Sequence, residues 1–591
     1  MSEENRRPRN NASRSNNPRN RRRKKKQIPP ALIVGLVVVF VVIVCIISSI
    51  IEKHTPSKKV MSQEDINARY GIAADTDVAI VLNGKIIADE KALYEGDKVY
   101  LRYEFVKANI NDKFYWDNFE NILSVTTPTD IIRSHVGTTE YTVTNSTKTV
   151  DYQVVKTKGN TVYIAADFIK EYTAFECAYY QTPNRVVIKT SYGEENVGTI
   201  NKNIKIREKA DIKADIVYSA TAKTKVKILG TSKGFSEVAT ADGWFGYVKS
   251  DEISGKKTES TVSTYVAPEY TRISLDKTIS LGWDQISVKG GGNLINNVTN
   301  AKGLNVVSPT WYRFEGNEGG LSSFADATYV EQAHLIGLQV WAMVDDQSEN
   351  SNDTEIFTHT SRRDAAVNTL VAEAIQYGID GINIDVEYLK EEASQAYIQF
   401  MRELSVKCRI NGIILSVDIK VPETRNNFCD VYGISKLGEV CDYVIMMGYD
   451  EHMSVDTGAG STASLNWVSN GIKYMTEQMD SSKIVCGIPF YTRSFTVDGQ
   501  DNVIETGVLP MGKDLELLAS KGVEATWVEE YGQKYGEYQE GDNIVRIWVE
   551  DAASIEAKLQ LIEQYNIAGI AAWRLGLEDV NIWNTIIKYT N

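Results

Sequence analysis

The stretch GIDGINIDVEYL, residues 378–389, decides how the C-terminal half of this chain is interpreted. Isoleucine or valine occupies every second position from 382 to 386, as expected of a strand with one buried face. The opposite face carries Asn383, Asp385 and Glu387. Burying carboxylates costs several kcal/mol unless they are paired or hydrogen-bonded. An antiparallel strand with one solvated face would avoid that cost, but it fits poorly between the helical patterns on either side.

Seven further apolar runs alternate with amphipathic segments. The eight runs are 279–285, 303–309, 337–346, 381–387, 412–419, 442–450, 483–491 and 569–576. Eight strands alternating with helices predict a closed parallel (β/α)8 TIM barrel. The long interval before Gly569 contains strand-like runs around Trp527 and Trp548, which predict an inserted α+β subdomain.

Active sites of such barrels lie at the C-terminal ends of the strands. Polar and aromatic residues gather at these ends: Trp283, Asp284, Asp345, Asp346, Asp385, Glu387, Tyr449, Asp450, Arg493 and Trp573. Because side chains alternate along a strand, Asn383, Asp385 and Glu387 are expected to face the barrel interior.

Four ordered motifs carry a family resemblance. DGINIDVE (380–387), MMGYD (446–450), GIPFYTR (487–493) and AAWRLG (571–576) resemble the signature stretches of glycoside hydrolase family 18, the chitinase-like barrels. The layout is most similar to the spore-germination and cell-wall N-acetylglucosaminidase branch. Asn383 departs from the family, which more often has Asp there; an Asn can hydrogen-bond to Asp385 but cannot hold a charge.

The resemblance implies residue roles. Glu387 would be the general acid and base, Asp385 would orient the substrate's acetamido group, and Tyr449 would hydrogen-bond to that group, with Asn383 beside them. Substrate contacts are expected from Trp573, Asp450, Trp283, Met447, Tyr491, Arg493 and Asp345. Asp284, Trp311 and Tyr312 either bind sugar or brace the barrel mouth. Asp380 and Gly381 are expected to be structural. No cofactor and no metal are expected.

The N-terminal segment indicates a membrane anchor. Residues 1–27 hold eleven Lys or Arg and two Glu, a net charge of +9, so the remaining residues carry −23. We expect this basic tail to be disordered and cytoplasmic. Residues 28–51 contain no charge and are long enough to span a bilayer. The positive-inside rule then places the rest of the chain outside the cell membrane. The acidic body argues against nucleic acid as a partner.

Two β-rich segments precede the barrel. Residues 77–192 contain a weak repeat of strand, short helix and strand, and they resemble the copper amine oxidase N-terminal-like domain. We expect them to act as a spacer. Residues 193–254 resemble a bacterial SH3-like domain, which either binds cell-wall peptides or serves as a spacer. Residues 52–76 and 255–271 are expected to be linkers, and residues 272–591 the catalytic barrel.

These observations predict a multidomain, membrane-anchored, extracellular glycosidase of a Gram-positive bacterium. It would cleave β-1,4 bonds of a GlcNAc-containing glycan, either peptidoglycan or a chitin-like polymer, by substrate-assisted retaining catalysis. The alternatives are a non-hydrolytic carbohydrate-binding protein and a chitinase or endo-β-N-acetylglucosaminidase acting on other glycans.

Overall fold

A computed structural model describes residues 29–422 and 432–590 of the chain. The basic tail and Cys429 lie outside this range. The chain divides into two compact units. One comprises residues 1–66 and 195–259, and the other comprises residues 67–194 and 260–591.

The larger unit contains the predicted barrel. Within the described residues, eight parallel strands close on themselves because β20 pairs with both β21 and β33. The strands are β20 (Ile279–Asp284), β21 (Val306–Glu315), β23 (Gln339–Asp345), β24 (Gly381–Asp385), β25 (Ile414–Lys420), β26 (Tyr443–Met447), β27 (Ile484–Pro489) and β33 (Gly569–Trp573). Every predicted run overlaps one of them. The short β22 (Gly320–Ser323) pairs antiparallel with β21.

Helices cover the outer faces of the strands. They include α5 (Leu294–Val298), α6 (Ala327–Leu335), α7 (Asp353–Thr358), α8 (Thr360–Tyr377), α9 (Ser394–Ile410), α11 (Ile434–Val440), α12 (Leu465–Gln478), α14 (Ala552–Tyr565) and α15 (Trp583–Thr590). Ile382 and Ile384 of β24 are buried in the core between strands and helices, as their alternation predicts. Helix α8 ends at Gly378, whose φ of 70° is a left-handed conformation that glycine adopts without strain.

The inserted subdomain lies between β27 and α14. It is a five-stranded antiparallel sheet in the order β29-β28-β32-β31-β30 with one helix. Its elements are β28 (Tyr491–Val497), β29 (Val503–Pro510), α13 (Lys513–Ser520), β30 (Thr526–Val528), β31 (Gln533–Glu540) and β32 (Asn543–Val549). Trp527 and Trp548 both lie in strands, as predicted.

The β-rich region before residue 194 belongs to the same compact unit. Its repeat is visible as β3 (Lys98–Arg102), α3 (Tyr103–Asn109) and β4 (Phe114–Asp117), followed later by β10 (Thr161–Ala165), α4 (Ala166–Tyr172) and β11 (Glu176–Tyr180). The other strands are β1 (Val78–Leu82), β2 (Lys85–Glu95), β5 (Ile122–Thr126), β6 (Ile131–His135), β7 (Glu140–Val143), β8 (Ser146–Thr149), β9 (Val155–Lys158) and β12 (Arg185–Lys189).

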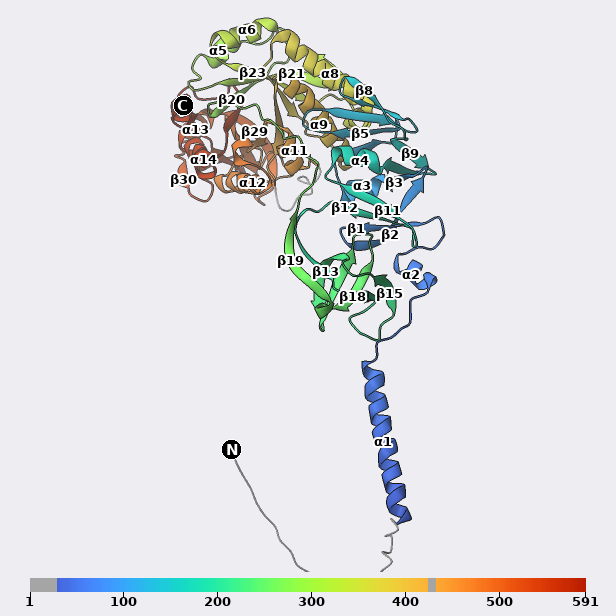
Figure 1. Ribbon diagram of the computed structural model, residues 1–591. Helices are drawn as coiled ribbons and strands as arrows, with labels where there is room; N and C mark the ends of the chain where they lie inside the picture. The colour runs from blue at the N-terminus through green and yellow to red at the C-terminus, as the bar shows by residue number, and fades with distance from the viewer. Residues whose placement is uncertain (1–28, 423–431, 591) are drawn as a thin grey trace, which may run out of the picture. The chain divides into compact units, whose positions relative to one another are not determined.

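This region is hydrogen-bonded to the barrel helices, and its role as a spacer stays a prediction. Figure 1 shows β5 alongside α9. The buried Asp117 carboxylate accepts hydrogen bonds from the Thr360 backbone N–H (2.7 Å) and hydroxyl (2.7 Å) at the start of α8. Arg133 of β6 contacts Glu403 of α9 at 3.0 Å. These contacts tie residues 67–194 to the outer face of the barrel.

The smaller unit holds a long apolar helix and a second β-sheet. Helix α1 (Pro30–His54) is exposed along residues 31–54 and is long and apolar enough to cross a membrane. The sheet has the order β15-β14-β18-β17-β16-β13-β19. Its strands are β13 (Gly193–Ile200), β14 (Ile204–Arg207), β15 (Ile216–Ala220), β16 (Lys225–Ser232), β17 (Phe235–Thr240), β18 (Phe245–Lys249) and β19 (Ile253–Thr261).

Candidate active site

Strand β24 delivers polar side chains to the barrel interior. Its five residues are all buried, and Asn383 and Asp385 point away from the helix-facing isoleucines. The strand ends at Asp385, so Glu387 lies in the following loop rather than in the strand. Its position therefore depends on what holds that loop.

The Asn383 amide is fixed by three hydrogen bonds. Its Oδ1 accepts from Trp283 Nε1 (3.0 Å) and Ser308 Oγ (3.1 Å). Its Nδ2 donates to Asp418 Oδ1 at 2.8 Å. The two donors on the oxygen fix which side of the amide is nitrogen. An Asn at position 383 can bond to Asp385, but here its Nδ2 donates to the carboxylate of Asp418 on the neighbouring strand.

Asp385 and Asp418 form a buried pair of carboxyl groups. The parallel register sets Ile384 opposite Val417, so the next residues along, Asp385 and Asp418, lie level on adjacent strands. Burial, followed by the charge of Asp418, raises the pKa of Asp385 well above its usual value. Burial also raises the pKa of Asp418, and its hydrogen bond from Asn383 opposes this. Asp385 Oδ1 is buried and has no hydrogen-bond partner among the described residues.

The loop that carries Glu387 is held by Asp346. The Asp346 carboxylate accepts from the backbone N–H groups of Glu387 (3.0 Å) and Tyr388 (2.8 Å). The Glu387 side chain is contacted at 3.4 Å on each oxygen, by Gln347 Nε2 and by Lys420 Nζ. Sequence reasoning placed Asp346 at the barrel mouth without assigning it this role, which only the folded loop reveals.

A second carboxyl lies beside Asp346. Asp353 begins helix α7, and burial followed by the charge of Asp346 raises the pKa of Asp353 to about 7. A protonated Asp353 can donate a hydrogen bond to the Asp346 carboxylate. Asp346 then stays negatively charged and can accept from the backbone N–H groups of the Glu387 loop.

Aromatic side chains line the interior beside these carboxyls. The Trp283 ring lies 5.9 Å from Trp573 and 6.3 Å from Tyr449, between ring centroids. Trp283 is 1% exposed, whereas Trp573 and Tyr449 are only partly buried. The buried Trp283 ring therefore supports the rings of Trp573 and Tyr449 from inside the barrel. Burial, then the charge of Asp418, raises the pKa of Tyr449 well above its usual value, so its phenol stays a hydrogen-bond donor.

The remaining predicted contacts fall into two groups. Asp450 Oδ1 accepts from Tyr491 OH (2.7 Å) and Arg493 Nη2 (3.0 Å), so these three residues form one cluster after β26 and β27. Met447 ends β26 and is partly buried. Asp345 instead is 4% exposed and bound by both Arg313 Nε (2.6 Å) and Nη2 (3.0 Å). Its carboxylate is thus held by Arg313, and its contact with a sugar stays a prediction.

Several residues that could have bound sugar are structural. Trp311 and Tyr312 lie in the core against the helices. Asp284 is 2% exposed and accepts hydrogen bonds from Tyr329 and Asn297, both at 2.8 Å.

Two residues expected to be structural, Asp380 and Gly381, lie at the start of β24. Asp380 accepts from the Val340 backbone N–H at 2.8 Å. A Cβ on Gly381 would come within 2.7 Å of the Trp341 indole.

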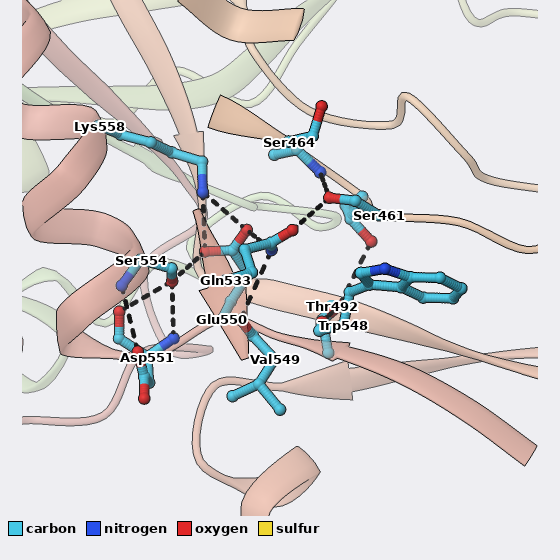
Figure 2. Close-up of polar contacts among 12 residues, drawn as sticks. Ser461, Ser464, Thr492, Gln533, Trp548, Val549, Glu550, Asp551, Ser554 and Lys558 are labelled. Carbon is cyan, nitrogen blue, oxygen red and sulfur yellow. Dashed lines mark hydrogen bonds and ion pairs between the residues drawn. The ribbon is translucent and has the colours of Figure 1, made fainter. Parts of the chain in front are cut away.

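A buried polar network anchors the loop that follows Tyr449 and Asp450. Figure 2 shows Lys558 of α14 and Gln533 of β31 converging on the Glu550 carboxylate. Lys558 and Glu550 are both fully buried, with Nζ to Oε1 at 3.0 Å. Ser461, in the loop between β26 and α12, donates to Gln533 Oε1. The network therefore ties this loop to the inserted subdomain and to the barrel. Across residues 29–422 and 432–590, no cluster of His, Cys, Asp and Glu has the arrangement of a metal site.

Comparison with known proteins identifies the same region. Residues 315–578 match the family model described as Glycosyl hydrolases family 18, and residues 81–188 match that of the Copper amine oxidase N-terminal domain. The chain is 24% identical over 300 residues to "Uncharacterized glycosylase YvbX" of Bacillus subtilis (49% of this chain, 85% of that protein). It is 26% identical over 222 residues to the "Cortical fragment-lytic enzyme" of B. subtilis (37% of this chain, 51% of that protein).

The chain therefore spans about half the length of the second relative. Among solved structures it is similar to the spore cortex-lytic enzyme SleL of Bacillus megaterium QM B1551. That match has 18% identity and a TM-score of 0.47, and it covers 56% of this chain and 78% of the other.

Proposed function

We propose that this glycosidase, whose residues 315–578 match the family 18 glycosyl hydrolases, cleaves β-1,4 bonds at GlcNAc in peptidoglycan. The observation that carries this proposal is the delivery of Asp385 and Glu387 to the barrel mouth beside Tyr449 and Trp573. One bacterial relative is named a glycosylase, which supports glycan cleavage, and the name of the other, a cortical fragment-lytic enzyme, supports peptidoglycan as the substrate.

The proposed chemistry uses the substrate's own acetamido group, as family 18 enzymes do in place of a second catalytic carboxylate. The acetamido oxygen attacks the anomeric carbon while Glu387 gives its proton to the leaving oxygen. Glu387, now a carboxylate, then removes a proton from the water that opens the oxazolinium ion. Two displacements at one carbon retain the β configuration. Glu387 ends as it began, protonated.

The neighbouring residues support this assignment. Asp385 would orient the acetamido group and stabilise the positive charge that develops on it. Tyr449 keeps its phenol proton and would donate a hydrogen bond to the acetamido oxygen. Trp573, braced by Trp283 at 5.9 Å, would offer its ring to the apolar face of the sugar. Asp346 would keep Glu387 at a fixed distance from the bond, since it holds two consecutive backbone N–H groups.

We also propose that α1 anchors the enzyme in the cell membrane with the barrel outside. Twenty-five helical residues extend about 37 Å, which exceeds a bilayer core of roughly 30 Å. The +9 charge of residues 1–27 favours a cytoplasmic N-terminus. We propose that residues 193–254 are an SH3-like module, on the strength of their antiparallel sheet and their sequence resemblance.

The test uses the full chain in detergent micelles with purified Gram-positive peptidoglycan, chitin oligomers and an N-glycosylated protein, each followed by mass spectrometry. We expect fragments from peptidoglycan with GlcNAc at the new reducing end. Reducing-end MurNAc would identify a muramidase and contradict the assignment of the bond. Cleavage of chitin or the glycoprotein alone would contradict the substrate. Binding to the wall without any fragments would favour a carbohydrate-binding protein.

A further inference from the structure

A turn in the β-rich region before residue 194 contacts the barrel where helix α8 begins. Its sequence is DNFE, at the end of β4 and before β5, and we call residues 117–120 the β4–β5 turn. Asp117 is 0% exposed, and its Oδ1 accepts from the backbone N–H groups of Phe119 (2.9 Å) and Glu120 (3.0 Å). The turn is therefore held in one conformation by its own first residue.

Two carboxylates of this turn bind the first two residues of α8. Asp117 Oδ2 accepts from the backbone N–H and from the hydroxyl of Thr360, both at 2.7 Å. Glu120 Oε2 accepts from the Ser361 backbone N–H at 3.0 Å, and its Oε1 accepts from the Ser361 hydroxyl. The first N–H groups of a helix have no partner within the helix, and negative charge stabilises that end. The turn thus supplies the start of α8 with its cap.

The residue at the N-cap position of α8 makes other contacts. The His359 ring stacks on Phe119 of the turn, with 4.3 Å between ring centroids. Its Nδ1 lies 3.0 Å from the backbone oxygen of Glu355 in the preceding helix α7, and a carbonyl oxygen only accepts, so Nδ1–H is the donor. His359 therefore connects the β4–β5 turn to α7.

Helix α7 connects the start of α8 to Asp346. Near its C-terminal end, Phe357 is fully buried, and its carbonyl accepts from Arg363 Nη1 of α8 at 2.6 Å. At its N-terminal end, the Asp353 carboxyl interacts with that of Asp346. Because α7 is a single helix of six residues held at both ends, a displacement of the start of α8 also displaces Asp353 and its contact with Asp346.

Asp346 holds the loop that carries Glu387, because it accepts from two consecutive backbone N–H groups there. We propose that the β4–β5 turn is a positioning element of the active site: it fixes the start of α8, and through α7 and Asp346 it fixes the place of Glu387. This inference rests on the proposed function, in which Glu387 is the general acid and base. The turn touches no substrate atom and acts through Asp346.

Another contact of the same region with the barrel offers a matched control. Lys113 Nζ contacts Glu439 Oε1 of α11 at 2.5 Å, and both side chains are partly exposed. Helix α11 lies between β25 and β26, so this ion pair attaches the region to the barrel at a place other than α7 and α8. Lys113→Met therefore weakens the attachment and leaves the contacts of the β4–β5 turn intact.

The test removes the side chains of the turn that are least needed for folding. Phe119 is 55% exposed, and the double variant Phe119→Ala, Glu120→Ala removes the stacked ring and one capping carboxylate. We expect its kcat on purified peptidoglycan to fall by roughly tenfold with KM nearly unchanged, because the position of the acid is disturbed and sugar binding is not. Glu120→Gln keeps an acceptor for Ser361 and should retain most of the activity. Lys113→Met should keep the wild-type kcat, and melting temperatures show whether each variant folds.

Hydrogen exchange followed by mass spectrometry gives a measurement that does not depend on hydrolysis. The backbone amides of Glu387 and Tyr388 are the two that donate to Asp346. In the double variant of the turn, these amides should exchange about tenfold faster than in the wild type, because their acceptor is less firmly held. In Lys113→Met they should exchange at the wild-type rate.

A folded double variant with the wild-type kcat, or with wild-type exchange at these two amides, would overturn the inference. A loss of rate that lies entirely in KM would also overturn it, and so would an equal loss in Lys113→Met. If the wild-type protein hydrolyses no glycan, the proposed function fails. The exchange rates then still decide whether the β4–β5 turn holds the Glu387 loop.

Discussion

Two buried carboxylates in the same barrel meet opposite surroundings. Glu403 on α9 contacts Arg363 Nε at 2.9 Å and Arg133 Nη2 at 3.0 Å. Although burial opposes it, these two cations lower the pKa of Glu403 to about 2. Asp385 has carboxyl groups as its charged neighbours, and burial with those charges raises its pKa. Glu403, which supports the fold, is thus paired with two cations. Asp385, to which we assign a role in the chemistry, instead lies among other carboxyl groups.

Next to the inserted subdomain, a second buried acid is also paired with a cation. Glu550 is fully buried, yet it receives both Lys558 Nζ, at 3.0 Å, and Ser554 Oγ, at 2.7 Å. A chain able to pair its buried acids in two places gives the pair of Asp385 and Asp418 no cation from the described residues. Like-charge clusters of this kind are expected at functional sites, where stability is given up for reactivity.

The largest effect should come from breaking the paired region. Arg363→Met leaves Glu403 buried with one cation fewer and should cost about 3–5 kcal/mol in the free energy of unfolding. Urea unfolding monitored by fluorescence measures this. The matched control is Lys588→Met, which removes an exposed partner of Glu556 and should cost less than about 1 kcal/mol. Equal costs at the two sites would contradict the contrast between buried and exposed pairs.

An intermediate effect should come from removing a like charge at the site. Asp385→Asn should lower kcat by about 100-fold, which corresponds to about 2.7 kcal/mol of transition-state stabilisation. Its melting temperature at pH 7 should equal or exceed that of the wild type, since a buried like charge is gone. Hydrolysis rates and calorimetry on the same samples decide this. An Asp385→Asn protein that is less stable than the wild type and fully active would contradict the contrast between Asp385 and Glu403.

The smallest effect is expected at the pair of Asp346 and Asp353. The pKa of Asp353 is raised from 3.8 to about 7, so the folded state binds this proton more tightly than the unfolded state. The stability from this group is therefore full below about pH 4 and declines as pH rises toward 7. In Asp353→Asn, the side-chain amide can still donate a hydrogen bond to Asp346, but it does not titrate. It should be about 1 kcal/mol more stable than wild type at pH 8 and little different at pH 4. Melting curves at both pH values test this, and a pH-independent difference would contradict it.

Sequence patterns predicted the barrel well because its strands have local signatures. Alternating apolar residues and intervening helical periods located all eight strands, and four motifs located Glu387 and Asp385. Local patterns could not identify the residues that lie beside these two carboxyl groups or hold their loops. Asp418 lies in the run ILSVDI, in phase with Ser416, but its place beside Asp385 depends on the register between two strands separated by α9. The role of Asp346 likewise follows from its contacts with the Glu387 loop, and that of Arg313 follows from the pairing of β21 with β23.

The same limit applies to other residues near the barrel mouth. Asp345 ends a strand at the barrel mouth, as a sugar ligand would, yet Arg313 on the neighbouring β21 holds it. Trp311 and Tyr312 follow the predicted run 303–309, but β21 continues through both and they lie in the core. The contacts of residues 67–194 with α8 and α9 could not be predicted from local patterns either, because they join positions more than two hundred residues apart.

The most direct test of this account compares two glutamates near the barrel mouth. Initial rates of new reducing ends released from peptidoglycan are measured for the full chain, for Glu387→Gln and for Glu391→Gln, whose side chain is exposed four residues away. The account predicts a loss of about 10²–10⁴-fold for Glu387→Gln and a nearly unchanged rate for Glu391→Gln. Hydrolysis by a folded Glu387→Gln protein at the wild-type rate would contradict it.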